Sequence, residues 1–213
     1  DGTVVTFTTD LGMLSSATAT TSGGVATATL SSEAAGSATV SADVGDAVDE
    51  VEVTFKPDVP EALTLEADPA ELTVGEVSDL TATVEDAYGN LVADGTVVTF
   101  TTDLGMLSSA TMTTTDGVAT AMLSSETWGT ASAMASAGAA TDGAAVVFNP
   151  GAAATLALEA DPAKLTVGES SELTATVEDA YGNAVADGTV VTFTTDLGEL
   201  SSGTATTTGG VAT

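Results

Sequence analysis

The sequence predicts an all-β protein built from tandem β-sandwich domains, and two observations carry this prediction. Apolar and polar residues alternate with a period of two along most of the chain, which is the pattern of strands that bury one face. The string DGTVVTFTTDLG starts at Asp1, again at Asp94 and again at Asp187, so it recurs every 93 residues. Because this period matches the size of a small domain, we expect each repeat to fold as one unit.

The repeats are close copies of one another. Residues 1–93 align with residues 94–186 without insertion or deletion, and 64 of the 93 positions are identical by direct count. The pattern divides the chain into the C-terminal part of one repeat (1–57), a complete repeat (58–150) and the N-terminal part of the next (151–213). We expect the chain to be a window on a longer polymer. The alternative is that its ends are true subunit ends, completed by neighbouring chains in a strand-exchanged filament.

The first half of the complete repeat contains three predicted strands. Leu63 to Ala67 alternate with polar residues and stop at Asp68-Pro69, because proline cannot donate a hydrogen bond to a sheet. Leu80 to Glu85 form a half-buried strand. Thr96 to Thr102 form the third strand, which is rich in β-branched residues and carries Phe100, the largest core candidate of this half.

A turn from Asp86 to Asn90 joins the second and third predicted strands. Gly89 and Asn90 tolerate positive φ, and the Asp86 side chain can cap its own turn. We expect Tyr88 to lie across the apolar residues beside this turn.

The second half of the repeat predicts three short strands and a final one. The short strands are residues 110–115, 117–125 and 129–137, and Asp116-Gly117 is a favourable hairpin turn between the first two. The final strand places Ala144, Val146 and Phe148 on one face, and Asn149-Pro150 closes the repeat.

Seven or so strands in a repeat of this length, with no helical periodicity, indicate an immunoglobulin-like β-sandwich in each unit. Aromatic residues make up only 4% of the chain, so Val, Leu, Ala and one or two Phe must fill each core. Trp128 is the single tryptophan, and the preceding copy has Ala35 at its place. We therefore expect Trp128 to be a local surface or loop feature.

The charge excludes several classes of partner. The net charge is -29, with 31 carboxylates against Lys56 and Lys164 and with no arginine or histidine. Nucleic acid is excluded because neutralising phosphates needs clustered Lys and Arg. A basic membrane-binding face is excluded for the same reason, and no apolar run approaches the roughly 18 residues of a spanning helix.

The order of motifs along the repeat resembles that of the group 1 bacterial Ig-like domains found in invasins and intimins. The matching motifs are LTVGE, LTATVEDAYGNLVADGTVVTF, DGVATAMLSS and WGTASAMAS. The matching residues are Asp86, Gly89, Asn90, Val97, Val98, Phe100, Gly117 to Thr120 and Gly129. The resemblance implies a bacterial cell-surface protein whose domains stack end to end as a stiff stalk, with receptor binding confined to specialised terminal domains. It transfers no binding residue to this chain.

Catalysis has few candidate residues. The chain has no His, Cys or Arg, and its Ser and Thr residues have no neighbouring base to activate them. The adjacent carboxylates Glu85-Asp86, Glu178-Asp179 and Asp49-Glu50 should point to opposite faces of their strands. We therefore expect no enzyme, no catalytic residue and no cofactor-binding residue.

Calcium is the one ligand that stays open. Carboxylates and an amide recur near predicted turns and strand ends, as oxygen ligands of a hard cation would. None of them forms the ordered acidic loop of a known calcium motif, so no metal-site residue is assigned. The candidates are Asp68, Glu85, Asp86, Asn90, Asp94, Asp103 and Asp116.

Together these observations favour a structural role. The leading hypothesis is a repeat segment of a long, acidic, extracellular surface protein that forms a stalk, spacer or fibre. Its partners would be neighbouring repeats of the same protein, with lateral or end-to-end self-association left open. The alternative is a cation-dependent adhesive array that attaches cells or surfaces.

Overall fold

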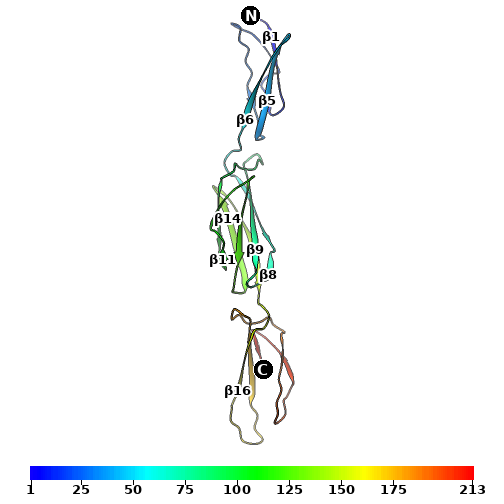
Figure 1. Ribbon diagram of the computed structural model, residues 1–213, viewed down its shortest axis with the longest axis vertical. Helices are drawn as coiled ribbons and strands as arrows, with labels where there is room; N and C mark the ends of the chain where they lie inside the picture. Colours follow the sequence, from blue (N-terminus) through cyan, green and yellow to red (C-terminus); the bar gives the residue numbers. More distant parts are fainter.

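The chain is a straight row of three groups of strands. A computed structural model describes all residues, 1–213. The groups follow one another along the long axis in sequence order, with the N-terminus at one end (Figure 1). All of the regular structure is β, and no helix in it could cross a membrane.

The central group contains two sheets that face each other. The first has the strand order β12-β10-β14-β15-β8 and the second has the order β11-β13-β9-β7. Their bounds are β7 (Ala62–Asp68), β8 (Glu71–Thr73), β9 (Val77–Glu85), β10 (Val97–Thr102), β11 (Met106–Leu107), β12 (Thr111–Thr113), β13 (Val118–Ser124), β14 (Gly129–Ala137) and β15 (Ala140–Asn149). This is the expected all-β, immunoglobulin-like sandwich, so the predicted fold class is confirmed.

Small aliphatic residues and two phenylalanines fill the space between the sheets. A single core cluster holds 18 buried residues, among them Phe100 of β10 and Phe148 of β15, which are at most 1% exposed. Alanine supplies much of the rest, including every second residue of β14 from Ala131 to Ala137. Burying each phenylalanine contributes about 1.5–3 kcal/mol. Phe100 is therefore in the core, as the sequence predicts.

The chain changes sheets between β7 and β8. Strand β7 ends at Asp68 as predicted and pairs with β9, whereas β8 pairs in parallel with β15 of the opposite sheet. The Asp68–Pro69 peptide at the crossing is cis. The sequence missed β8 because three residues are too few to show alternation, and it missed the two-residue β11 for the same reason.

The turn at Asp116-Gly117 has the predicted local form but a different role. Both residues have positive φ (50° and 73°), and Thr115 and Val118 form a bridge across the turn. The strands that follow do not extend this hairpin, because β12 pairs with β10 and β13 pairs with β9. The turn therefore connects the two sheets rather than two neighbours in one ladder.

The N-terminal group forms one sheet and a small ladder. The sheet has the order β3-β1-β5-β6, and β2 pairs with β4. Their bounds are β1 (Val4–Thr9), β2 (Met13–Leu14), β3 (Thr18–Thr20), β4 (Leu30–Ser31), β5 (Gly36–Val44) and β6 (Ala47–Phe55).

The C-terminal group has the sheet order β16-β17-β20 and a β18-β19 pair. The bounds are β16 (Thr155–Asp161), β17 (Glu172–Glu178), β18 (Val190–Thr192), β19 (Thr204–Thr206) and β20 (Val211–Ala212). Leu158 of β16 is 57% exposed, while its counterpart Leu65 of β7 is 5% exposed. The difference arises because β14 and β15 lie across the core from Leu65 and no corresponding strands cover Leu158.

Candidate functional site: the joint between successive domains

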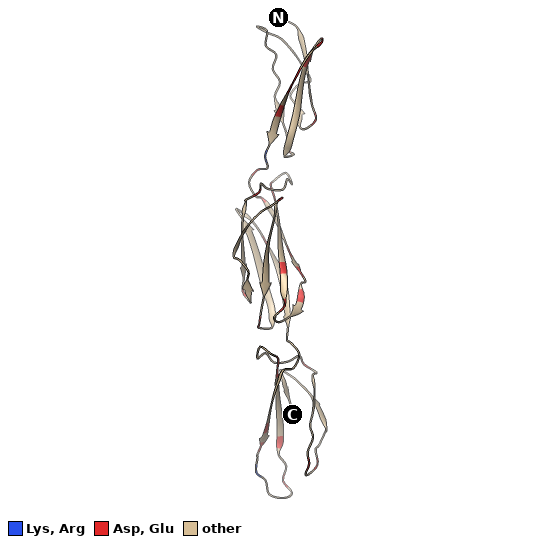
Figure 2. Cartoon of the chain, viewed as in Figure 1, with Lys and Arg blue, Asp and Glu red and all other residues tan.

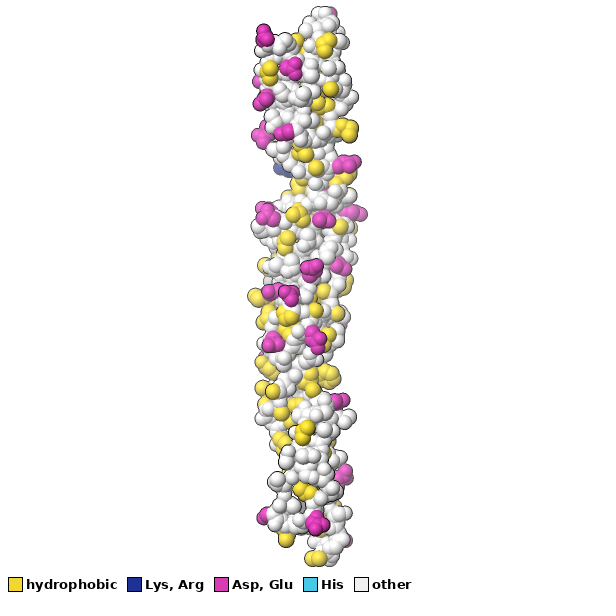
Figure 3. Space-filling model, turned by 90° about the vertical axis from the view of Figure 1, so that its right-hand side faces the viewer, with side chains coloured by type: hydrophobic (Ala, Val, Ile, Leu, Met, Phe, Trp, Pro, Cys, Tyr) yellow, Lys and Arg dark blue, Asp and Glu magenta, His cyan; other side chains and the backbone are white.

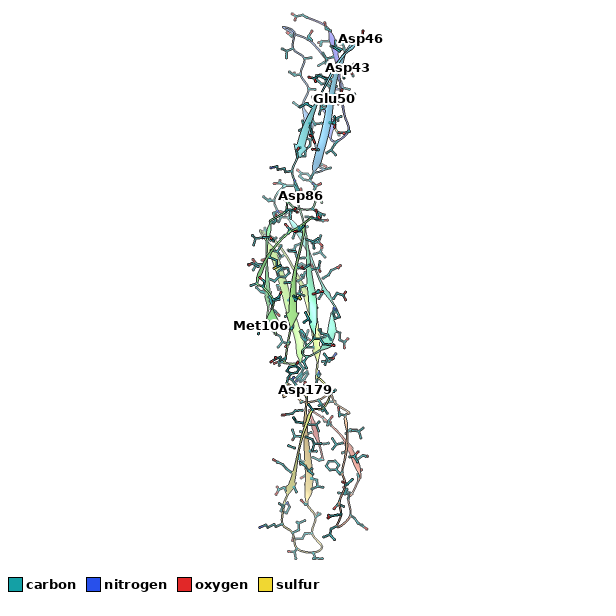
Figure 4. The ribbon with its side chains drawn as sticks, in the orientation of Figure 1. Asp43, Asp46, Glu50, Asp86, Met106 and Asp179 are labelled. Atoms are coloured by element: carbon teal, nitrogen blue, oxygen red, sulfur yellow. The ribbon has the colours of Figure 1, made fainter.

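The turn from Asp86 to Asn90 lies where the central group meets the N-terminal group (Figure 4). It follows β9 and closes on the Asp86 carboxylate, whose Oδ1 accepts hydrogen bonds from the N–H groups of Tyr88 and Asn90, both at 2.9 Å. Gly89 has φ +80°, which a residue with a side chain rarely adopts. The Asp-x-x-Gly-Asn sequence therefore forms a turn that is capped by its own aspartate.

The same carboxylate also holds the linker that enters the domain. Asp86 Oδ2 accepts a hydrogen bond from the Asp58 N–H at 3.0 Å, and Asp58 belongs to the segment that follows β6. Burial of Asp86, which is 3% exposed, opposes ionisation, but the donors from Asp58, Asn90 and Tyr88 outweigh it and lower the pKa to about 2. The carboxylate is therefore ionised at neutral pH and joins turn and linker.

The geometry repeats at the second boundary. Figure 4 places Asp179 where the central group meets the C-terminal group. Its Oδ2 accepts a hydrogen bond from Gly151 N–H at 2.9 Å, and Oδ1 accepts from Tyr181 and Asn183 N–H, both at 2.9 Å. Burial again opposes ionisation, and these donors lower the pKa of Asp179 to about 2. The joint is therefore a property of the repeat.

Asn90 connects the turn to the preceding group. Its Oδ1 accepts a hydrogen bond from the Ala35 N–H at 2.9 Å, and its Nδ2 donates to the Glu33 carbonyl oxygen at 2.7 Å. Both partners lie in the loop between β4 and β5. The side chain also donates to Asp86 Oδ2 at 3.0 Å, so one asparagine joins the loop, the turn and the buried carboxylate.

Asn183 makes the corresponding contact at the second joint. Its Nδ2 donates to the Glu126 carbonyl oxygen at 2.7 Å, and Glu126 lies in the loop between β13 and β14. The two cross-boundary pairs, Glu33 with Asn90 and Glu126 with Asn183, are both separated by 57 residues. Trp128 takes the place of Ala35 in this repeat, and no hydrogen bond corresponds to the one that the Ala35 N–H donates to Asn90. The Trp128 side chain is 54% exposed in its loop, as the sequence predicts.

A glycine receives the tyrosine of the following domain. Gly75, in the turn between β8 and β9, has φ +85°, and a Cβ on it would lie 2.8 Å from Tyr181 Cζ and closer still to the hydroxyl oxygen. Gly75 N–H donates to the Ser125 carbonyl oxygen at 2.8 Å, which ties this turn to the loop that Asn183 contacts. The end of one domain is therefore shaped to fit the start of the next.

The prediction that Tyr88 lies across the apolar residues beside its turn is wrong. This side chain is 59% exposed and lines a cleft of ≈ 250 Å³ at the first joint, together with Phe55, Lys56 and Asn90. Tyr181 shows the reason, since it reaches the neighbouring domain instead of covering apolar residues of its own. Period-two patterning cannot reveal such a contact, because the partner lies in another repeat.

The calcium candidates do not gather at one place. Asp68, the last residue of β7, and Asp103, which follows β10, lie at one end of the sandwich. The other candidates lie at the opposite end: Glu85, Asp86, Asn90, Asp94 and Asp116. Several already accept N–H donors: Asp94 Oδ1 accepts from Asp116 N–H, and Asp103 Oδ1 accepts from Ser132 N–H, both at 2.7 Å. No three acidic groups converge in the geometry of a metal site. Calcium binding stays a prediction for experiment.

Comparisons with known proteins identify the complete domain. Residues 60–151 match the family model described as invasin, domain 3. Similar solved structures are InvD of Yersinia pseudotuberculosis (24% identity, TM-score 0.59, 85% of this chain and 61% of that chain) and the Escherichia coli adhesin FdeC (24%, 0.54, 84% and 64%). Another is invasin, titled a bacterial integrin-binding protein (23%, 0.53, 85% and 40%).

At these identities the structures establish the fold alone, and this chain spans less than two thirds of the length of each of the three. No curated protein sequence matches the chain. The family match, the two facing sheets and the Asp-x-x-Gly-Asn turn agree with one another. The complete domain is therefore a bacterial Ig-like domain of the invasin and intimin type.

Proposed function

We propose that this chain is a segment of an extracellular adhesin of the bacterial surface and serves there as a stiff spacer. The single observation that carries the proposal is the repeated joint, in which an asparagine of one domain is hydrogen-bonded to a loop of the domain before it. A short linker between domains normally permits relative motion. Here the linker N–H and the turn share one buried carboxylate, so bending a joint breaks several hydrogen bonds together.

The surface composition supports the same role. Acidic side chains are spread along the length of the rod on the face shown in Figure 3, and the chain has only two lysines to offset them. Charges of one sign repel one another along a rod and oppose its folding back, most strongly at low ionic strength. Stiff joints and like charges would together keep an array extended and carry a terminal domain away from the cell.

Small-angle X-ray scattering of the chain in physiological salt tests the spacer proposal. A straight row of domains predicts a pair-distance distribution with a long, nearly linear tail and a maximum dimension that does not change with salt. A broad distribution with a shorter maximum dimension in high salt would mean that the joints bend freely and that charge alone extends the chain. That result would contradict the stiff spacer.

A cation-dependent adhesive array is the second candidate, and it also fits an acidic surface protein. In that case calcium would have to bind at the joints or between chains. The Asp86 and Asp179 carboxylates already accept N–H donors on both oxygens, which favours a joint that needs no metal. An enzymatic role is not proposed, since no group of residues in the joints combines a nucleophile with a base.

A further inference from the structure

One face of the central domain differs in charge from the rest of the molecule. The side chains of β10, β14 and β15 that point away from the core are all uncharged, and most are Thr, Ser, Val or Ala. We call this surface the neutral face. The outward face of the opposite sheet carries Glu66, Asp68, Asp79 and Glu85. The same sheet carries one outward carboxylate, Glu71, at its edge in β8. In a chain of net charge -29, three neighbouring strands without an outward carboxylate are a marked exception.

The preceding repeat shows that the fold does not require a neutral face. Its strands β5 and β6 have the same pairing register as β14 and β15, but they carry Asp43, Glu50 and Glu52. The positions 93 residues later hold Ser136, Gly143 and Ala145. Asp43 and Glu50 lie along the N-terminal sheet in Figure 4, and β14 carries no acidic segment in Figure 2. Three carboxylates are therefore replaced by small neutral residues on otherwise similar strands.

The centre of the neutral face is partly apolar, with small side chains around one methionine. Gly143 lies opposite Met134, and a Cβ on Gly143 would lie 2.7 Å from the methionine sulfur, so the Met134 side chain lies across the glycine. Met134 is nevertheless 46% exposed, and Val97 is 56% exposed. Small side chains permit close approach of a second surface, while the flexible methionine thioether adapts to the partner.

We propose that the neutral face is the surface on which a second copy of this chain docks side by side. Charge identifies the partner: elsewhere two copies would bring carboxylates together or bury them without a counterion, and both are unfavourable. Docking of the neutral face of one copy on the neutral face of another avoids both costs. A shift by one repeat would set this face against Asp43, Glu50 and Glu52, so the pairing also fixes the stagger between chains.

The area predicts weak association per domain. The three strands span roughly 30 Å by 15 Å, so a pair of faces buries on the order of 900 Å², which is the size of a transient interface. Tandem arrays would strengthen such contacts through many simultaneous interactions. The proposal concerns lateral contacts and does not depend on the stiffness of the joints.

The absence of cysteine allows the docking to be trapped chemically. Ser132→Cys places a single thiol in the middle of the neutral face, and Thr120→Cys places one on the exposed outer face of β13 as a matched control. Under mild oxidation we expect the Ser132→Cys chain to form disulfide dimers at least about tenfold faster than the control. Equal rates for the two chains would overturn the proposal.

A second pair of variants separates docking from general charge repulsion. In the Ser132→Cys chain, Ser136→Asp with Ala145→Glu restores residues that the preceding repeat carries, and it should reduce the dimer rate to that of the Thr120→Cys control. Thr64→Glu with Thr120→Glu adds equal charge to the opposite sheet and should leave most of the dimer rate intact. An equal loss in both variants, or none in the first, would refute docking through the neutral face. An unchanged dimer rate in the first variant is the result expected if the chains associate through the exposed leucines of β16.

Discussion

Asn90→Ala is the most direct test of the joint. The substitution removes two hydrogen bonds across the domain boundary, from Ala35 N–H to Asn90 Oδ1 (2.9 Å) and from Asn90 Nδ2 to the Glu33 carbonyl oxygen (2.7 Å). Each is worth about 0.5–1.5 kcal/mol net, so the closed joint should lose about 1–3 kcal/mol relative to bent forms. This corresponds to a decrease of about 5- to 150-fold in the ratio of closed to bent joints.

Distance distributions between two spin labels measure this ratio. Because the chain has no cysteine, labels can be attached at Thr39→Cys and Thr120→Cys, two exposed strand positions on either side of the first joint. We expect one narrow distance peak in the parent chain and a broad distribution after Asn90→Ala. The central domain should retain a cooperative unfolding transition, because its core does not include Asn90.

Asn149→Ala is the matched control. Its Nδ2 donates to Glu71 Oε1 at 2.9 Å within the central domain, so the change removes an asparagine hydrogen bond without touching a joint. The distance distribution should stay narrow. If Asn90→Ala also leaves it narrow while the domain is folded, the asparagine does not hold the joint and the reasoning above is wrong.

Three further predictions concern single sites, and a fourth concerns calcium. Gly75→Ala should cost about 1–2 kcal/mol in urea unfolding for its positive φ, and more because it must also displace Tyr181. Gly168→Ala, with the same type of φ and open space around it, should show only the cost of the φ angle. The pKa of Asp179 is about 2 in the folded chain against 3.8 for the free side chain, so its contribution to stability is full above pH 4 and lost as the pH falls towards 2. Urea unfolding across this range should show the loss, and Asp179→Asn should abolish it. Ser78→Ala should raise stability by about 1 kcal/mol in urea unfolding, because the Ser78 Oγ is buried without a hydrogen-bond partner; a decrease would reveal a contact that this structure lacks. Melting temperatures in calcium and in excess chelator should agree, and a large drop on chelation would favour the cation-dependent array.

Much of the central domain could be predicted from sequence because its strands alternate clearly. The alternation placed β7, β9, β10, β14 and β15 correctly and put Phe100 and Phe148 on the inner face. It missed β8 and β11, which are too short to show a period. The boundaries at residues 57 and 150 stay predictions, since they rest on the repeat pattern alone.

The candidate site was only half visible in the sequence. The Asp-x-x-Gly-Asn string predicted a capped turn, and that turn forms through Asp86 and Gly89. The partners of Asn90 and Tyr181 lie in other repeats, and side-chain periodicity within one repeat contains no information about them.

By itself, the sequence determined what local chemistry and repetition can determine: the all-β class, the 93-residue period, the acidic surface and the positions of most strands. These follow from alternation and turn chemistry, which act over a few residues. Only the tertiary structure decided that Asn90 is bonded to a preceding domain and that β10, β14 and β15 present an uncharged outer surface. Both depend on which strands become neighbours. Long-range packing decides this, because strand edges must form hydrogen bonds and apolar faces must be buried across the whole domain.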